Sequence, residues 1–377
     1  MRLLHFGKYA FGHAGGMERH VELLTRGLAA RGADVWVVAY DPSGRAEPAV
    51  IDGVHVEPVR PLVHFGSQAI APALFSRAAR LSRQGQFDVV HQHWPDPFAH
   101  VAASVAAKGA VHVATWHSDI LRQRYVGAAY RFLGPRLLRR PDAVIGATSA
   151  HLASSQVDAF APPERRHVVA YGVDMASLRL TDGVRQRVAR LRERYGNRPL
   201  VFALGRHVYY KGFDVLIRAM AEVPAVLLLG GDGPLSSELR SQAARTGAAV
   251  EFLGAIPEVD LAVYFHACDV YCMPSVAATE AFGLVQVEAM ACGKPVVNTW
   301  LGNGVNLVAP DGLVASTVQP GDAAALAAAL RRILEDPALA ARLGEEGRKR
   351  AVREFSVDAM VGQTMDLYTN LLRDRKG

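Results

Sequence analysis

Short apolar runs recur along the whole chain and alternate with stretches long enough to form helices. The first series of runs lies at residues 3–6, 35–39, 88–91, 111–115, 143–148 and 168–171. Strands that are apolar on both faces, separated by helix-length segments, are typical of parallel sheets with helices on both sides. A second series lies at residues 200–204, 225–229, 250–253, 270–273, 296–298 and 313–315. The doubled pattern predicts an α/β protein with two Rossmann-like domains.

The boundary between the two predicted domains follows the segment Tyr171-Gly172-Val173-Asp174. A polar, arginine-rich helix is expected at 182–195, which places the linker near 173–180. The length of 377 residues agrees with two domains, because a single core usually stops growing at about 250–300 residues. We therefore expect an N-terminal domain at 1–173 and a C-terminal domain at 174–359. An amphipathic helix predicted at 357–372 comes after the second domain is complete.

The composition is that of a globular enzyme, with 50% hydrophobic and 21% charged residues. The sequence shows neither an apolar run long enough to span a bilayer nor the apolar core of a signal peptide, so we expect a cytoplasmic protein. The three cysteines, Cys268, Cys272 and Cys292, are odd in number and lack C-x-x-C spacing. This pattern predicts buried free thiols in place of disulfides or a zinc site.

The positive charge is concentrated in the first half of the chain. Residues 1–175 carry 19 Lys and Arg against 14 Asp and Glu, whereas the whole chain has a net charge of +6. Six arginines interleave with apolar and aromatic residues: Arg122, Arg124, Arg131, Arg136, Arg139 and Arg140. This stretch suits either a helix that contacts anionic lipid headgroups or an ordinary solvated helix over a core. No signature of nucleic-acid binding accompanies the charge.

The segment from Glu280 to Glu288 carries the most specific chemistry. It follows the predicted strand at 270–273, so it lies where ligands bind in open α/β sheets. Gly283 permits close backbone approach and precedes a predicted helix at 284–291, whose first amides can hold a diphosphate. Glu288 lies about one turn into that helix, where its carboxylate can accept hydrogen bonds from ribose hydroxyls. Either glutamate alone would suit a surface position, but the pair around Phe282-Gly283 predicts a ligand site.

Two cations follow the first strand of the second domain. Gly205-Arg206 ends that strand, and Lys211-Gly212 opens the next helix. A diphosphate leaving group gains negative charge as its bond to the sugar breaks, and two fixed cations would stabilise it without a metal ion. The structural alternative is that Arg206 and Lys211 only pair with nearby carboxylates.

The first domain has weaker candidates. Gly15-Gly16, followed by Glu18, opens a helix expected to end near residue 30, and this loop could bind a phosphate or an acceptor headgroup. His117 follows the strand at 111–115 and faces the same sheet edge. Metal ligation by a group of His91, His93 and Asp96 is conceivable, but a strand-to-loop corner favours structural roles, and we predict no metal site.

Together these residues resemble glycosyltransferase family 4, the retaining transferases of GT-B fold that are common in bacterial polysaccharide and lipopolysaccharide assembly. The resemblance covers almost the whole chain, and its most specific part is the Glu280–Glu288 block, which is similar to the E-x7-E element of the family. The resemblance implies two Rossmann-like domains that face a central cleft. It also implies that a C-terminal helix, here 360–377, returns to the N-terminal domain, which binds the acceptor, while the C-terminal domain binds the nucleotide sugar.

The resemblance also implies roles for single residues. Glu280 contacts hydroxyls of the donor sugar, Glu288 holds the ribose, and Arg206 and Lys211 bind the diphosphate. His117 contacts the transferred sugar, so the expected catalytic set is His117, Arg206, Lys211 and Glu280. Donor-binding residues are expected at Gly16, Gly205, Phe282, Gly283, Leu284, Val285 and Glu288, and acceptor-side residues at Gly15, Glu18 and His93.

One segment departs from the commonest family pattern. Residues 301–312 replace the usual Gly-Gly followed by a glutamate and are closer to a subgroup of mannosyl- and deoxyhexosyltransferases that use GDP-linked donors. GDP-mannose is therefore the leading donor, with a UDP-sugar as the alternative. The resemblance implies that the protein needs no cofactor or metal ion. It also implies that the acceptor is a saccharide or is linked to polyprenyl diphosphate. With the basic first half, it also suggests peripheral contact with the anionic inner face of the cytoplasmic membrane.

Other classes of protein fit the sequence less well. A glycan phosphorylase of the pyridoxal phosphate type would be far longer, and a nucleotide-sugar epimerase is a further GT-B alternative. A dehydrogenase is disfavoured because the segment from Gly7 to Gly12 is not G-x-G-x-x-G. A non-catalytic nucleotide-sugar-binding subunit has less need of Arg206, Lys211, Glu280 and Glu288 together.

Overall fold

The computed structural model describes residues 1–9, 11, 15–65, 68–117, 140–153, 155–196 and 198–375. The chain divides into two compact units, one formed by Met1–Gly172 with Val357–Gly377 and the other by Val173–Ser356. The predicted arginine-rich segment falls almost wholly within 118–139, outside the described residues, and only Arg140 of that set is described. Within the described part of the chain, no helix has the length and hydrophobicity needed to cross a bilayer.

The first unit contains an eight-stranded sheet in the order β10-β9-β8-β7-β1-β2-β4-β3. All neighbours pair in parallel except β3 and β4. The strands are β1 (Arg2–Tyr9), β2 (Asp34–Tyr40), β3 (Ala49–Ile51), β4 (Val54–Val59), β7 (Val89–Trp94), β8 (Val111–Trp116), β9 (Ala143–Gly146) and β10 (Arg166–Val168), with a separate hairpin of β5 (Val63–Phe65) and β6 (Gln68–Ile70). The helices are α1 (Gly16–Ala30), α2 (Ala73–Gln84), α3 (Pro97–Ala106), α5 (Ser149–Leu152), α6 (Ser155–Phe160), the 3₁₀ turn η1 (Pro163–Arg165) and α15 (Val357–Asp374).

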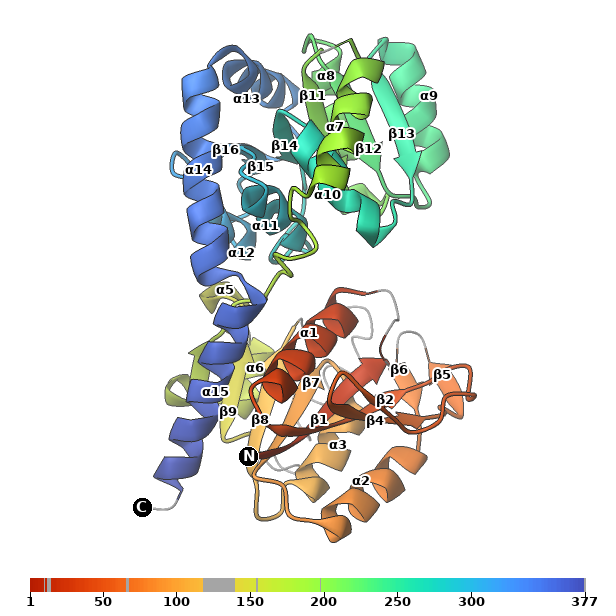
Figure 1. The fold of residues 1–377 in the computed structure, drawn as a ribbon, viewed down its shortest axis with the longest axis vertical. Helices are drawn as coiled ribbons and strands as arrows, with labels where there is room; N and C mark the ends of the chain where they lie inside the picture. Colours follow the sequence, from red (N-terminus) through yellow and green to blue (C-terminus); the bar gives the residue numbers. More distant parts are fainter. Residues whose placement is uncertain are drawn as a thin grey trace. The chain divides into compact units, whose positions relative to one another are not determined.

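Side-chain alternation along the strands builds a core on each face of this sheet. In β1, Leu3 packs with α1 and α15, whereas Leu4 and Phe6 pack with α2 and α3. His5 has the parity of Leu3, so it points toward α1 and α15. The C-terminal helix thus completes the first unit, and Figure 1 shows α15 beside α1.

The contact between α1 and α15 depends on the small residue Gly27. A Cβ atom built at Gly27 would lie 2.4 Å from Val361 Cγ2. We predict that Gly27→Ala lowers the free energy of unfolding. Overpacking costs about 1–3 kcal/mol, whereas the higher helix propensity of alanine over glycine returns only about 1 kcal/mol. Gly362→Ala on α15 is the matched control, because its Cβ would meet only Arg31 Nη1 at 3.3 Å. Urea denaturation measures both, and equal stability of the two variants would contradict this packing.

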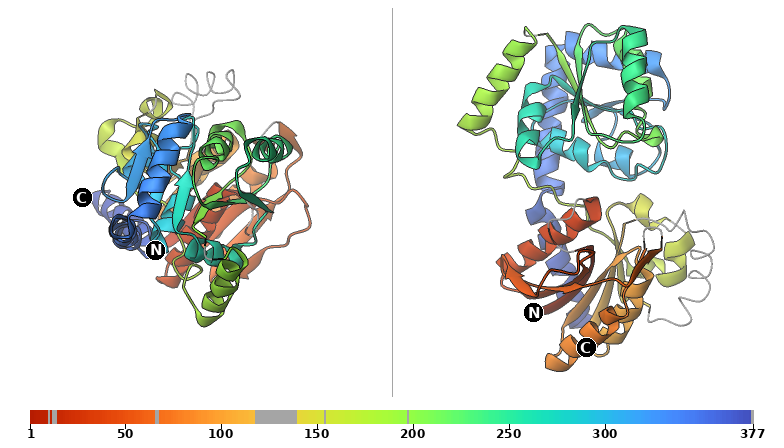
Figure 2. Two further views of the ribbon diagram at one scale, coloured as in Figure 1. Left: turned by 90° about the horizontal axis from the view of Figure 1, so that it is seen from above. Right: turned by 90° about the vertical axis from the view of Figure 1, so that its right-hand side faces the viewer.

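The second unit contains a parallel six-stranded sheet in the order β13-β12-β11-β14-β15-β16. Its strands are β11 (Leu200–Leu204), β12 (Val226–Gly230), β13 (Val250–Gly254), β14 (Val270–Met273), β15 (Val296–Thr299) and β16 (Ala315–Val318). Its helices are α7 (Asp182–Arg194), η2 (Tyr209–Lys211), α8 (Phe213–Met220), α9 (Ser236–Thr246), α10 (Glu258–Ala267), α11 (Leu284–Ala291), α12 (Gly304–Val308), α13 (Ala323–Glu335) and α14 (Pro337–Glu354). The right-hand view of Figure 2 shows helices on both sides of this sheet. The predicted α/β class with two Rossmann-like units is confirmed.

The structure differs from the sequence prediction at three places. The four strands between residues 49 and 70 were not predicted. In one of them, β4, the buried Glu57 interrupts the apolar pattern, and it pairs with Arg77 and Arg80 of α2. The strand predicted at 168–171 is β10, which ends at Val168. The strand predicted at 313–315 begins only at Ala315, because the preceding residues form a turn in which the Val314 amide donates to the Pro310 carbonyl.

Candidate functional site

The strand order of the second unit changes direction between β11 and β14. The strands β12 and β13 continue to one side of β11, and β15 and β16 continue to the other side of β14. Since β11 and β14 are parallel neighbours, their carboxyl ends lie at the same edge. Ligands of open α/β sheets bind at such a switch point. The loop after β11 carries Gly205, Arg206 and Lys211, and the loop after β14 carries Glu280, so the fold brings these predicted residues to one place.

Lys211 and Glu280 form an ion pair at this edge. The distance between Lys211 Nζ and Glu280 Oε2 is 2.5 Å, and each side chain is only 12% exposed. Lys211 ends η2, and Glu280 lies in the turn between β14 and α11. Lys211 therefore pairs with a nearby carboxylate, as the structural alternative expected. That carboxylate belongs to Glu280, which is itself a predicted catalytic residue. The pair places a cation and an acceptor of hydrogen bonds from hydroxyl groups side by side.

Glu288 lies close to the same strand end. The pKa of the buried Tyr271 hydroxyl on β14 is raised well above its usual value, first by burial and then by the negative charges of Glu280 and Glu288. Both carboxylates therefore act on one ring, although they are eight residues apart. Glu288 is partly exposed on α11.

The start of α11 is shaped by Gly283. Gly283 has φ of 75°, and a Cβ there would lie 2.8 Å from Met273 Cε, so only glycine suits this position without strain. The preceding Phe282 is buried against Phe355, with ring centroids 5.9 Å apart, while Leu284 and Val285 are partly exposed in the first turn. The positive end of the helix dipole and its first amides thus lie beside the Lys211–Glu280 pair, where they can bind an anion.

Arg206 and Gly205 lie on the β11 side of this edge. The Gly205 amide donates to the Gly230 carbonyl at 3.2 Å, and the Lys211 side chain runs across Gly205. Arg206 is exposed and makes no ion pair with any residue that the structure describes. Its guanidinium is therefore available to a phosphate oxygen.

A buried polar network supports α11 from behind. Gln286 donates to the carbonyls of Phe282 and Val305 at 3.1 and 3.0 Å and accepts from Asn298 at 3.2 Å. Asn298 in turn donates to the Ala309 carbonyl at 3.1 Å and accepts from the Thr317 hydroxyl. Fully satisfied buried networks fix a unique geometry. Sequence reasoning missed these residues, because polar side chains at strand and helix positions carry no motif.

Asn303 joins the unusual segment 301–312 to the predicted catalytic loop. Its side-chain oxygen accepts from the Val305 amide at 3.0 Å and caps α12, while its side-chain nitrogen donates to the Glu280 carbonyl at 2.7 Å. The departure from the family pattern thus holds the backbone of Glu280.

We predict that Asn303→Asp lowers kcat/KM about tenfold, because it keeps the helix cap but replaces the donor to the Glu280 carbonyl by a carboxylate oxygen. Asn303→Ala should lose similar activity and, in addition, about 1 kcal/mol of stability through the lost cap. Steady-state kinetics and urea denaturation of both variants separate the two contributions. Unchanged kcat/KM in Asn303→Asp would contradict a role for this hydrogen bond.

In the first unit, His117 belongs to a row of contacting rings. The nitrogens His5 Nδ1 and His93 Nε2 are 3.4 Å apart, His93 Nδ1 and His117 Nε2 are 3.2 Å apart, and His117 Nδ1 lies 2.7 Å from the Tyr171 hydroxyl. Burial lowers the pKa of all three imidazoles, to about 3 for His5. His93 is 1% exposed and lies behind His117, so it supports that ring from the interior. Tyr171 gave no signal in the sequence, because it follows the last strand without a motif.

The remaining candidates of the first unit lie around the start of α1, which follows β1. Gly15 precedes the first helical residue, Gly16, and both are exposed. The Glu18 carboxylate folds back over Gly15, where a Cβ would meet its oxygen. Asp96 is the N-cap of α3, with Oδ1 accepting from the Ala99 amide at 2.9 Å, so its carboxylate is already used in the fold.

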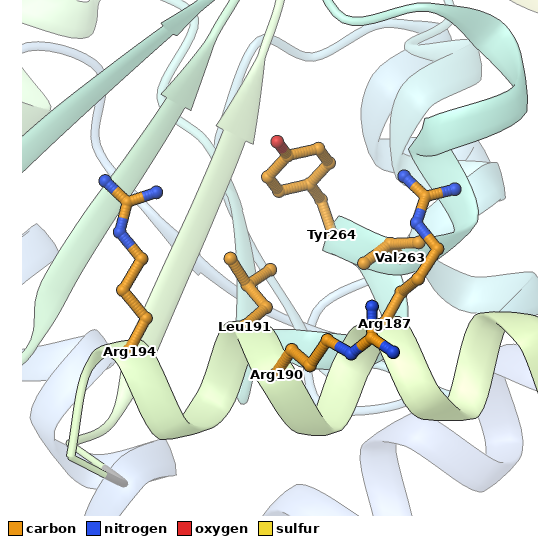
Figure 3. A pocket seen from close by; sticks show the side chains of 6 residues that line it. All are labelled: Arg187, Arg190, Leu191, Arg194, Val263 and Tyr264. Atoms are coloured by element: carbon orange, nitrogen blue, oxygen red, sulfur yellow. The ribbon is translucent and has the colours of Figure 1, made fainter.

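A surface pocket of about 330 Å³ lies between α7 and α10 (Figure 3). It is lined by Arg187, Arg190, Leu191, Arg194, Val263 and Tyr264. Two of its arginines are paired, Arg187 with Asp260 at 2.7 Å and Arg194 with Glu251 at 2.8 Å. None of the predicted site residues lines this pocket, so it is separate from the switch-point edge.

Comparison with known proteins agrees with this geometry. Residues 14–177 match the family model "Glycosyltransferase Family 4", and residues 186–350 match "Glycosyl transferases group 1". The chain is 27% identical to O-antigen chain mannosyltransferase C of Escherichia coli over 377 residues, which is 100% of both chains. It is 30% identical to D-rhamnosyltransferase WbpZ of Pseudomonas aeruginosa over 365 residues, covering 94% of this chain and 92% of the relative. Anabaena HepE, solved in complex with UDP, superposes with a TM-score of 0.79 over 98% of this chain and 100% of its own, at 22% identity.

Two Rossmann-like units, with cations and glutamates at the switch point of the second, are the architecture of the GT-B fold. The chain belongs to glycosyltransferase family 4, the group 1 glycosyl transferases. The resemblance inferred from the Glu280–Glu288 block is thereby confirmed.

Proposed function

We propose that this protein transfers a hexosyl residue, with retention of anomeric configuration, from a nucleotide diphosphate sugar to a saccharide or polyprenyl-diphosphate-linked acceptor in bacterial cell-surface polysaccharide or lipopolysaccharide assembly. The observation that carries the proposal is the Lys211–Glu280 pair beside the start of α11. Such an edge offers a cation and helix amides to a diphosphate and a carboxylate to sugar hydroxyls.

The proposed reaction proceeds on one face of the sugar. The bond between the anomeric carbon and the diphosphate oxygen breaks, and the acceptor hydroxyl forms its bond from the same side. The proton of the acceptor hydroxyl passes to the departing phosphate, so no separate side-chain base is needed. Arg206, Lys211 and the α11 amides stabilise the growing charge of the leaving group, and positioning with charge stabilisation supplies the rate. No metal cofactor is required for this chemistry.

Mannose from GDP-mannose is the leading donor. The segment 301–312 supports it, and so do the names of two relatives, a mannosyltransferase and a D-rhamnosyltransferase. A UDP-sugar is the alternative, because Anabaena HepE was solved with UDP. A membrane-bound acceptor would bring the protein to the inner face of the cytoplasmic membrane, and binding to anionic vesicles at low salt tests that part.

The test of the reaction is incubation with GDP-mannose or UDP-hexoses and a bacterial lipid extract, with EDTA present. We expect the protein to release one nucleoside diphosphate, and only when the extract is present. We also expect NMR to show an α-linked product from an α-linked donor. A product whose new linkage has the opposite anomeric configuration to the donor would overturn retention. Binding of a nucleotide sugar without transfer to any acceptor would favour the alternative of a non-catalytic binding subunit.

A further inference from the structure

Five histidines gather on the α1 and α15 side of the first sheet. His5, His91 and His93 come from β1 and β7, His117 follows β8, and His20 lies on the second turn of α1. The ring of His20 packs against those of His93, His117 and Tyr171, with centroid separations of 5.5, 5.0 and 4.9 Å. The sequence pattern concealed this cluster, because its members are spread over more than 110 residues.

His20 has no partner for either ring nitrogen. It is 6% exposed, and neither Nδ1 nor Nε2 forms a hydrogen bond with the described residues. A buried polar group without a partner is costly and needs an explanation, and a bound ion supplies one. One nitrogen each of His20, His93 and His117 lies within 4.8 Å of the other two.

From this geometry we propose that His20, His93 and His117 form a binding site for a divalent transition metal ion of the Zn²⁺, Co²⁺ or Ni²⁺ class. The 3.2 Å between His93 Nδ1 and His117 Nε2 is close to the about 3.3 Å that separates two nitrogens on a tetrahedral ion with bonds of about 2.0–2.1 Å. Imidazole suits these metals, and the ion gives His20 the partner it lacks.

The surroundings hold two of the ligands in the required tautomer. With the metal on His117 Nε2, the Nδ1 proton of that ring is donated to the Tyr171 hydroxyl at 2.7 Å. With the metal on His93 Nδ1, the Nε2 proton points to His5 Nδ1 at 3.4 Å. Such outer contacts are usual for metal-ligating histidines.

A second group of three, His5, His91 and His93, is less suited to a metal. His91 Nδ1 lies 2.6 Å from the Tyr368 hydroxyl and His91 Nε2 lies 2.8 Å from Thr115 Oγ1. Both nitrogens of His91 are therefore occupied. A chain of hydrogen bonds through His5, His93 and His117 alone would account for three rings but would leave His20 without a partner.

The proposed site departs from the sequence prediction of no metal, and it is not part of the transfer reaction. Resting on the proposed function in this one respect, we expect the metal to inhibit transfer, because it fixes the His117 ring that is expected to contact the transferred sugar. Metal binding itself is measured without donor or acceptor, so its failure is distinguishable from failure of the proposed function.

The experiment is titration of the metal-free protein with Co²⁺, followed by visible absorption. The expected result is one equivalent of Co²⁺ with the intense bands of tetrahedral coordination. His20→Phe keeps a ring in the same place and should weaken binding at least about 100-fold, since losing an outer-sphere partner alone costs about 10–100-fold. Tyr171→Phe should weaken it about tenfold, and His167→Phe on β10, outside the cluster, should leave it unchanged.

Absence of tetrahedral Co²⁺ bands in the wild-type protein, or equal binding by His20→Phe, would overturn the proposal. Circular dichroism establishes that each variant is folded. If His20→Phe is unfolded, X-ray absorption of the Zn²⁺-loaded wild-type protein decides the matter. Three imidazole ligands support the site, and one or none contradicts it.

Discussion

Replacement of Glu280 by alanine is expected to lower kcat/KM about 1,000-fold or more while the protein remains folded. Glu280 is 12% exposed, pairs with Lys211 at 2.5 Å and stands at the strand end where the donor sugar is expected to bind. Its loss removes the acceptor of hydrogen bonds from the sugar and leaves Lys211 without its counter-charge. Steady-state kinetics with the identified donor measures the effect.

Glu280→Gln and a surface control separate chemistry from folding. The glutamine variant keeps the volume and should also lose most activity, because it lacks the negative charge. Glu238→Ala removes an exposed glutamate from α9 of the same unit and should retain full activity. Turnover near the wild-type level in both Glu280 variants would contradict the assignment of this residue.

Lys211→Ala is expected to lower kcat about 100- to 1,000-fold, as removal of one group that stabilises transition-state charge does in other enzymes. The Lys211 side chain runs across Gly205 at the end of β11 and reaches the switch-point edge. There it can neutralise the diphosphate as the sugar leaves. Lys211→Arg, which keeps the charge in a different shape, should recover part of the rate.

The control for Lys211 is Lys349→Ala, which removes an exposed lysine on α14 that pairs only with Glu346 at 2.9 Å among the described residues. It should leave kcat unchanged. A Lys211→Ala variant that changes KM but not kcat would show that Lys211 acts in ground-state binding alone.

The fold could be predicted where local signals agree with tertiary structure. Helix α11 spans the predicted residues because Gly283 sets its start, and α1 begins at Gly16 as expected. Strand β4 could not be predicted, because its buried Glu57 is compensated only by Arg77 and Arg80 of a later helix. A charge inside a strand looks exposed until its partners are placed.

The site shows the same division. The sequence located Arg206, Lys211 and Glu280 because they lie in loops that follow strands, and it located Glu288 because this residue lies one turn into the helix after Gly283. The sheet order then brings the two loops to one edge. The sequence did not reveal that Lys211 meets Glu280. Asn303 and Tyr171 were missed because their roles depend on contacts to Glu280 and His117, 23 and 54 residues away.

A donor site at the switch point of the second unit is tested most directly by thermal unfolding of the protein with GDP, UDP, ADP, NAD and the corresponding nucleotide sugars, with and without Mg²⁺. A single nucleoside diphosphate at about 100 times its Kd should add about 2.7 kcal/mol of stability and raise Tm by about 5–10 °C in the unit that binds it. We expect such a shift with one nucleoside diphosphate and its sugar, independent of Mg²⁺ and smaller in Lys211→Ala. No shift with any nucleoside diphosphate, or an equal shift in Lys211→Ala, would contradict a donor site at the switch point of the second unit.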